Sequence, residues 1–269
     1  MARGHADGGS QQRLRLPVSW AVLRAGAWLI PQWGVGGRLL FLALGTSFFF
    51  LLRACEMFAV SKAAMHAVHG LRRGDVAFFR GAVQLSEAQW SSADCVEVRF
   101  RSSKGDQLRQ GAVLTRTREG TPHRVDEGGG AVDLMVELLS CYPSLPSHAP
   151  LVAIGVGGGR WDLLTKHRAE SALRQVVSLA GLQPSEFALH SLRIGGATHL
   201  AAVGASPEVL RREGRWAGED GFRPYVRRHG RDPEWVSKAL ANCERSVSTP
   251  PGQGTKWGAV EAAENGQSA

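Results

Sequence analysis

The most apolar part of the chain, from Leu39 to Leu52, constrains the fold more than any other segment. It is shorter than the about 20 apolar residues that an α-helix needs to cross a bilayer. Charged residues follow it closely, at Arg53 and Glu56. Such a run is typical of a helix buried in the core of a globular domain. Helical structure is predicted from about 39 to 67, in one or two pieces.

A second periodicity predicts a small sheet. Val96, Val98 and Phe100 alternate with charged residues, as in a strand with one buried face. Three further short strands are expected, at 75–79, 83–85 and 112–115. Together the four strands indicate an antiparallel sheet over residues 75–116.

Helices account for most of the remaining pattern. They are expected at 16–30, 132–139, 163–179 and 191–203, with a further helix starting at Ser206-Pro207, where Ser is a good N-cap and Pro suits the first position. Glycines at 34–37 and a Pro-, Gly- and Ser-rich stretch at 143–159 are expected to be a break and a loop. The sequence therefore predicts an α+β fold that is mostly helical, in one domain over 16–245. A disordered arm is expected at 1–15 and a disordered tail at 246–269.

The charge balance favours a polyanionic partner. The 269 residues include 32 Lys and Arg against 24 Asp and Glu, a formal net charge of +8, which suits binding to nucleic acid. The four cysteines form no CxxC pair, so neither a zinc site nor a disulfide framework is indicated, and a reducing compartment is expected. The polar first residues lack the apolar core of a signal peptide, so an intracellular location is expected.

Four residues that could grip and attack a phosphate occur in order: His190, Arg193, Trp216 and Tyr225. His190 and Arg193 are three residues apart and would share one face of the predicted helix. A guanidinium fork fits two phosphate oxygens, an imidazole can move a proton, and an indole N–H is a donor. The phenol of Tyr225 could attack phosphorus once a base or nearby cations help to deprotonate it. The set points to breakage and rejoining of phosphodiester bonds.

These residues resemble the motif of the tyrosine recombinases, which include the phage-type integrases. In that family HxxR is followed by a His or Trp, and then by the nucleophilic Tyr about nine residues later. The run HSLRIGGAT, from His190 to Thr198, is similar to the family's HSxRxGxAT, and Gly214-Arg215-Trp216 resembles a common form of the next box. The resemblance covers about residues 16–245 and implies the catalytic domain of that family.

The family also requires an earlier arginine and a lysine, which the resemblance assigns to Arg53 and Lys104. The run LLRACE is similar to the first arginine box, in which an acidic residue follows the arginine by three positions. Glu56 would then lie one helical turn from Arg53 and orient it. Lys104 lies at the expected hairpin turn between the two arginine boxes, with Arg101 and Arg109 close by.

The resemblance implies a transesterification of DNA without a metal or other cofactor. Arg53 and Arg193 would bind the scissile phosphate, Tyr225 would form a 3′-phosphotyrosyl link, and Lys104 would protonate the departing 5′ oxygen.

His190 would act as the base for Tyr225 or as a phosphate donor, and Trp216 would donate its N–H to the phosphate. The implied function is DNA integration or recombination on double-stranded DNA, by a homotetramer, in a nucleus or nucleoid.

Two other interpretations stay open. Residues 195–212 resemble a helix-turn-helix, so the chain could be a simple DNA-binding protein. It could also be an inactive relic of a mobile element that only binds DNA. The latter is favoured by the short stretch before the first predicted helix, which is too small for the N-terminal domain that closes around DNA in this family.

Overall fold

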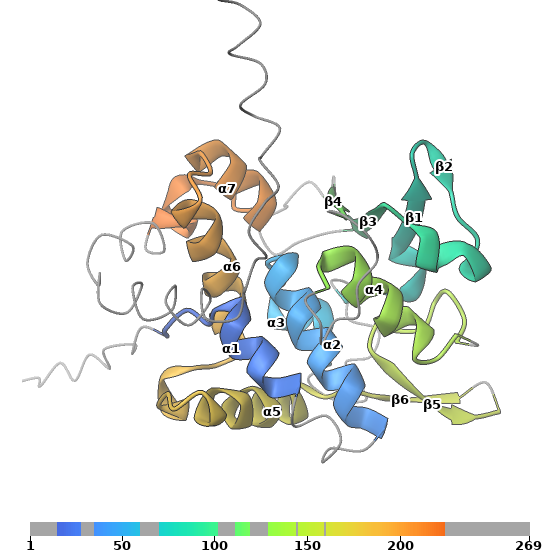
Figure 1. Ribbon diagram of the computed structural model, residues 1–269, viewed down its shortest axis with the longest axis horizontal. Coiled ribbons are helices and arrows are strands. Elements are labelled where there is room, and N and C mark those ends of the chain that lie inside the picture. Colours follow the sequence, from blue (N-terminus) through green and yellow to red (C-terminus); the bar gives the residue numbers. More distant parts are fainter. Residues whose placement is uncertain are drawn as a thin grey trace, which may run out of the picture. The chain divides into compact units, whose positions relative to one another are not determined.

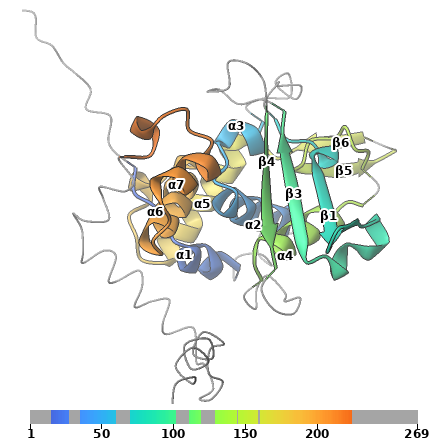
Figure 2. The same cartoon turned by 90° about the horizontal axis from the view of Figure 1, so that it is seen from above.

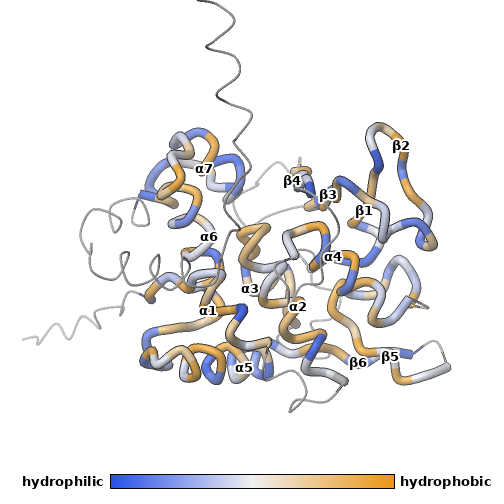
Figure 3. The backbone as a smooth tube through the Cα atoms, in the orientation of Figure 1, coloured by the Kyte–Doolittle hydropathy of each residue, from blue (hydrophilic) through white to orange (hydrophobic). Residues whose placement is uncertain are grey.

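The apolar segment forms helix α2, Val35–Phe49, in the computed structural model, which describes residues 15–27, 35–59, 70–101, 111–118, 129–143, 145–158 and 160–223. Every side chain from 39 to 44 is buried. Most of the length of α2 is hydrophobic (Figure 3). Four helices contact it (Figure 1): α1 (Trp20–Ala25), α4 (Ala131–Ser140), α5 (Lys166–Leu179) and α6 (His190–Ala202). The prediction of a buried helix is confirmed.

The break predicted at 34–37 lies in part inside a helix. Gly36 and Gly37 lie inside α2, so the predicted break there is wrong. Packing of the apolar side chains outweighs the low helix propensity of glycine. The helix instead ends at Phe49, Leu51 adopts a φ of 49°, and a short helix α3 follows, Ala54–Met57.

Helix α1, Trp20–Ala25, is shorter than the predicted 16–30. Ser19 is its N-cap and has an extended backbone, and residues 15–18 before it are not helical. The backbone N–H of Val18 donates to the carbonyl of Ser191 at 3.2 Å. A contact with a distant part of the chain therefore replaces the first helical turn.

The predicted antiparallel sheet is confirmed. Its strands are β1 (Val76–Arg80), β2 (Val83–Gln84), β3 (Cys95–Phe100) and β4 (Ala112–Thr117), in the order β2-β1-β3-β4. Val96 pairs with Phe78, and Val98 pairs with Leu114. These four side chains are buried on one face of the sheet.

The stretch predicted as a loop contains a second sheet, so that prediction is wrong in part. Strand β5, Ala153–Gly157, pairs with β6, Arg160–Leu163, in an antiparallel hairpin. Gly157 and Gly158 have positive φ angles of 85° and 59° at the turn. The glycines that suggested a loop are the residues that a tight hairpin turn requires.

The sheet and most of the helices lie on opposite sides of α2 and α4 (Ala131–Ser140), as Figure 2 shows. The helices on the far side from the sheet are α1, α5 (Lys166–Leu179), α6 (His190–Ala202) and α7 (Pro207–Gly214). Short 3-10 turns complete the described elements, at Arg73–Asp75, Glu87–Ser92, Pro184–Glu186 and Glu219–Gly221. Within the described ranges, no helix has both the length and the apolar character needed to cross a bilayer.

Two glycines let α6 approach its neighbours closely. A Cβ atom on Gly195 would overlap the carbonyl oxygen of Val18, and one on Gly196 would lie 2.5 Å from the carbonyl oxygen of Phe48. The backbone of α6 therefore packs directly against the segment before α1 and against the end of α2. This packing positions the first turn of α6, which carries His190.

Candidate functional site

Four of the six predicted catalytic residues lie close to where the end of α2 meets the end of α7. Leu51 and Arg215 are the only non-glycine residues with positive φ in the described part of the chain, at 49° and 53°. L-residues avoid this left-handed region, so it persists only where the surroundings stabilise it. The Leu51 carbonyl oxygen accepts hydrogen bonds from Arg193 Nη1 at 2.5 Å and from Arg215 Nη2 at 3.4 Å. One carbonyl group thus joins the two strained turns.

Arg53 lies at the N-cap of α3, in the short break between α2 and α3, which is one of the two arrangements that the sequence left open. Its backbone N–H donates to Glu56 Oε2 at 2.8 Å, and its Nη1 donates to Glu56 Oε1 at 3.0 Å. Its Nη2 donates to the carbonyl oxygen of Arg215 at 3.2 Å. The Glu56 side chain is 1% exposed, whereas the Arg53 side chain is 21% exposed. A buried carboxylate therefore orients an arginine that still reaches solvent.

Arg193 is fully buried, with 1% of the residue exposed. Its Nη1 donates to Leu51, its Nη2 donates to the carbonyl oxygen of Gly214, and its guanidinium carbon lies 4.4 Å from the centroid of the Trp216 ring. A buried charge is costly without such partners. Carbonyl oxygens and an aromatic face offset that cost, and they connect α6 to the ends of α2 and α7.

Trp216 follows α7, and its ring packs against two glycines. A Cβ atom on Gly214 or on Gly221 would overlap the indole ring. The ring of Phe222 lies 5.8 Å away between centroids. The small residues on both sides of Trp216 therefore make room for the ring beside Arg193.

His190 is the first residue of α6 and is solvent-exposed. Its pKa lies below the ordinary value of 6.5, first because protein atoms displace water around it, and then because Arg193 and Arg53 add positive charge. A neutral imidazole at pH 7 has a lone pair that can accept a proton.

Four of the predicted catalytic residues therefore lie together: Arg53, His190, Arg193 and Trp216. Lys104 and Tyr225 lie outside the described residues, and their positions stay predictions. The strand that leads toward Lys104 is described up to its end at Phe100.

Arg215 also belongs to this site, although the sequence analysis assigned it no role beyond its place in the Gly214-Arg215-Trp216 motif. Its side chain is 5% exposed, and its Nη2 donates to Glu56 Oε2 at 2.7 Å. Its Nη1 donates to the carbonyl oxygen of Phe50 at 3.2 Å, and its guanidinium carbon lies 3.8 Å from the centroid of the Phe100 ring. No local pattern could have found these contacts, because Glu56 is 159 residues away in the sequence.

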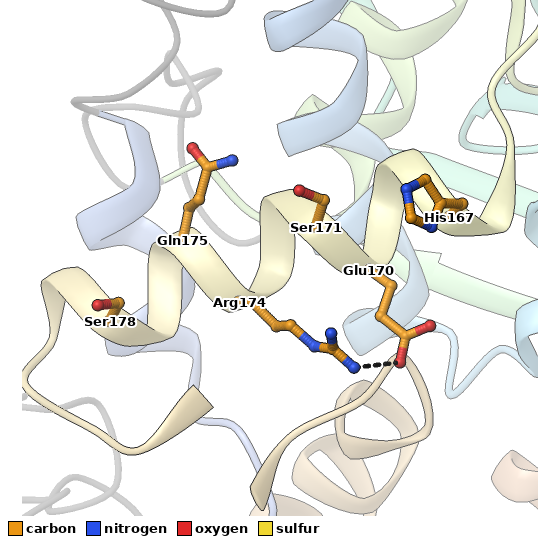
Figure 4. A pocket seen from close by; sticks show the side chains of 6 residues that line it. All are labelled: His167, Glu170, Ser171, Arg174, Gln175 and Ser178. Atoms are coloured by element: carbon orange, nitrogen blue, oxygen red, sulfur yellow. Dashed lines mark hydrogen bonds and ion pairs between the residues drawn. The ribbon is translucent and has the colours of Figure 1, made fainter. Parts of the chain in front are cut away.

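A surface pocket elsewhere lies along α5 (Figure 4). Its described lining residues are His167, Glu170, Ser171, Arg174, Gln175 and Ser178. They come from one helix, and Arg174 pairs with Glu170 within that helix. The pocket shares no residue with the group around Arg193.

No family model and no curated protein matches the sequence. The structure, however, is similar to solved recombinases. The XerH site-specific recombinase in a post-cleavage complex with palindromic difH substrate superposes with a TM-score of 0.54 at 15% sequence identity, over 88% of this chain and 56% of XerH. Its pre-cleavage complex with difH gives 0.51 at 16% identity, over 83% and 53%. The XerA recombinase gives 0.50 at 13% identity, over 93% of this chain and 67% of XerA.

The chain has the fold of the tyrosine recombinase catalytic domain. This agrees with the predicted α+β class, mostly helical with a small antiparallel sheet. The chain spans about half the length of the XerH recombinase that it matches. At these identities the likeness concerns the fold alone.

Proposed function

We propose that this chain breaks and rejoins double-stranded DNA, with Tyr225 as the nucleophile. One observation carries the proposal. The fold brings Arg53, His190, Arg193 and Trp216 together from segments far apart in the sequence. Two guanidinium groups, an imidazole and an indole form a cationic group of the kind that binds a phosphate and stabilises the charge that grows during its displacement.

The proposed first step is a transesterification without a metal. The Tyr225 oxygen forms a bond to phosphorus, the bond from phosphorus to the 5′ oxygen breaks, and a 3′-phosphotyrosyl link results. His190 accepts the phenol proton, and Lys104 gives a proton to the departing 5′ oxygen. In the reverse step a 5′-hydroxyl of another strand attacks the link and releases Tyr225. The number of phosphoester bonds is conserved, so the reaction needs no ATP.

The two arginines differ in their readiness to bind a phosphate. Arg53 is partly exposed, while Arg193 is buried and donates to two backbone carbonyl groups. A contact between Arg193 and a phosphate therefore requires a local movement that exposes its guanidinium. The segment from Gly214 to Trp216 covers it and is the part that we expect to move. DNA binding would supply the free energy for this change.

The test is to trap the covalent intermediate. Duplex DNA that is nicked at random is incubated with the protein, and adducts that survive denaturation are collected. A nick close to the cleavage position lets the short leaving strand diffuse away, so the adduct accumulates. The wild type should give an adduct with nucleotide attached to Tyr225, found by mass spectrometry, and Tyr225→Phe should give none.

Tyr142→Phe is the matched control, because Tyr142 is the other of the two tyrosines in the chain. It should form the adduct as the wild type does. An adduct that persists in Tyr225→Phe would refute the assignment of the nucleophile. DNA binding without any adduct in the wild type would favour the inactive relic or the simple DNA-binding protein. The proposed homotetramer and the location in a nucleus or nucleoid rest on the family resemblance.

A further inference from the structure

Arg215 occupies a backbone position that usually favours glycine. It ends α7 with a φ of 53° and a ψ of 47°, in the left-handed region. Glycine is the common residue at such a helix end because it has no Cβ to crowd the carbonyl group. An arginine at this position indicates that its side chain makes contacts whose free energy offsets the backbone strain.

The side chain of Arg215 connects three segments that meet at the site. It donates to Glu56 in α3 at 2.7 Å, and to the carbonyl oxygens of Phe50 and Leu51 after α2 at 3.2 and 3.4 Å. Its guanidinium also lies over the ring of Phe100 at the end of β3, at 3.8 Å. These contacts use a rigid, planar group that can donate in several directions, which lysine cannot reproduce.

Arg215 also contacts Arg53 by two routes. The backbone carbonyl oxygen of Arg215 accepts from Arg53 Nη2 at 3.2 Å. The carboxylate that binds the Arg215 side chain also accepts from Arg53 Nη1, at 3.0 Å through Glu56 Oε1. Arg53 is therefore bound directly by the backbone of Arg215 and, through Glu56, is linked to its side chain.

We propose that Arg215 is a positioning residue for the cleavage reaction: it fixes the direction of the Arg53 guanidinium and couples it to the Gly214–Trp216 segment. The inference rests on the function proposed above, since it assigns Arg53 to the scissile phosphate. The Arg215 side chain is not expected to touch DNA, because it is 5% exposed and contacts Glu56 and the ring of Phe100.

The test uses Arg215→Gly, which removes the side chain and suits the left-handed backbone, so its effects do not arise from strain. Arg174→Ala is the control, an arginine of α5 whose side chain is 52% exposed and lies away from the site. The first measurement is independent of DNA. Side-chain N–H resonances of Arg53, assigned by their loss in Arg53→Lys, should be separate in the wild type and in Arg174→Ala. They should move closer together in Arg215→Gly, because Glu56 and the loop that carry the Arg53 acceptors lose the side chain that fixes them.

The second measurement is the rate of adduct formation on the nicked duplex. At saturating DNA it should fall by about 100-fold in Arg215→Gly, the scale expected when a catalytic group is misplaced by about 1 Å. The DNA concentration for half the maximal rate should change by less than about threefold, because positioning affects the reaction more than binding. A residue that only stabilised the fold would change the melting temperature and leave this rate as it was.

Unchanged Arg53 resonances in Arg215→Gly, or a wild-type cleavage rate, would overturn the inference. If the wild type forms no adduct at all, the proposed function fails, and the resonances still decide whether Arg215 orders Arg53. If Arg215→Gly does not fold, the same two measurements are made on Arg215→Lys. It keeps the positive charge beside Glu56 and loses the planar fork that reaches Phe50 and Leu51.

Discussion

A buried carboxylate, Glu56, is the residue on which the local arrangement most depends. It is 1% exposed and accepts hydrogen bonds from the backbone and side chain of Arg53 and from the side chain of Arg215. Two guanidinium groups share one negative charge there. Removing that charge leaves both cations partly buried without their counterion, which is far more costly than losing an exposed ion pair.

Glu56→Gln is therefore expected to lower the free energy of unfolding by about 3 kcal/mol. Urea unfolding followed by tryptophan fluorescence measures it. Glu170→Gln is the control, because Glu170 pairs with Arg174 on the surface of α5, where the side chains are 26% and 52% exposed. That change should stay within about 0.5 kcal/mol of wild type. Equal effects of the two substitutions would contradict a central role for Glu56.

The charge state of His190 gives a prediction about pH. Displaced water and the charges of Arg193 and Arg53 lower its pKa in the folded protein below 6.5. Between the folded and unfolded pKa values, the unfolded chain binds more protons at this residue, so the free energy of unfolding rises with pH across that window. The contribution of neutral His190 is fully present above about 6.5 and is lost as pH falls toward the folded pKa.

An NMR titration of the His190 ring should therefore have its midpoint below 6.5, and Arg53→Met should raise that midpoint. The resonance is identified by its loss in His190→Gln. In the same His190→Gln variant, the contribution of this residue should disappear, so stability should fall less steeply than in the wild type as pH drops below about 6.5. If the midpoint of the His190 titration does not change in Arg53→Met, the His190 and Arg53 side chains are not electrostatically coupled.

At the scale of elements, the decisive contact is the close approach of α6 to its neighbours. Gly195 and Gly196 lie where the backbones of α6, of the segment before α1 and of the end of α2 come together. Backbone atoms cannot move aside as a flexible side chain can. The glycines are therefore required by packing, although glycine is a poor helix former.

Gly195→Ala is expected to lower the free energy of unfolding by about 3 kcal/mol or more, because the overlap with the Val18 carbonyl outweighs the better helix propensity of alanine. Urea unfolding measures the loss. Ser178→Ala, on the exposed side of α5, is the control and should stay within about 0.5 kcal/mol. A stabilised Gly195→Ala would mean that α6 does not pack as described.

The strand and helix predictions succeeded where the pattern is strong and local. Strand β3 alternates between buried and less buried residues, and Ser206 caps α7 as expected, accepting from the backbone N–H of Val209 at 3.3 Å. The failures have a common cause. Helix α1 loses its first turn to a contact with α6, and the glycines at 36 and 37 join α2 because its side chains are buried. Long-range packing overrode local propensity in both.

At the scale of the whole molecule, the net charge of +8 predicts DNA binding that depends on salt. The last turn of α7, beside the site, carries the exposed residues Arg211 and Arg212. Changing both to Gln should reduce the slope of log affinity against log salt by up to about two, one for each lost phosphate contact. Fluorescence anisotropy with a labelled duplex at several salt concentrations measures the slope.

Arg174→Gln is the control for this prediction, since Arg174 is exposed on α5 and already pairs with Glu170. Its slope should equal that of the wild type. If Arg174→Gln lowers the slope as much as the α7 changes do, the protein binds DNA through its overall charge and not through the face that carries the site.

The sequence alone determined which residues are available for phosphate chemistry, and in which order. The motif around His190 and Arg193, the apolar run before Arg53 and the alternating strand at 95–100 are local patterns, and local patterns carry the class of fold. Only the tertiary structure decided that Arg53 and Arg193 bind neighbouring residues of the segment from 214 to 215. That depends on two left-handed turns, at Leu51 and Arg215, and on hydrogen bonds between residues 142 to 162 positions apart. Such contacts form because a buried charge is costly unless it is paired or hydrogen-bonded. Its partners can come from any segment that packs beside it, so a local sequence pattern does not predict them.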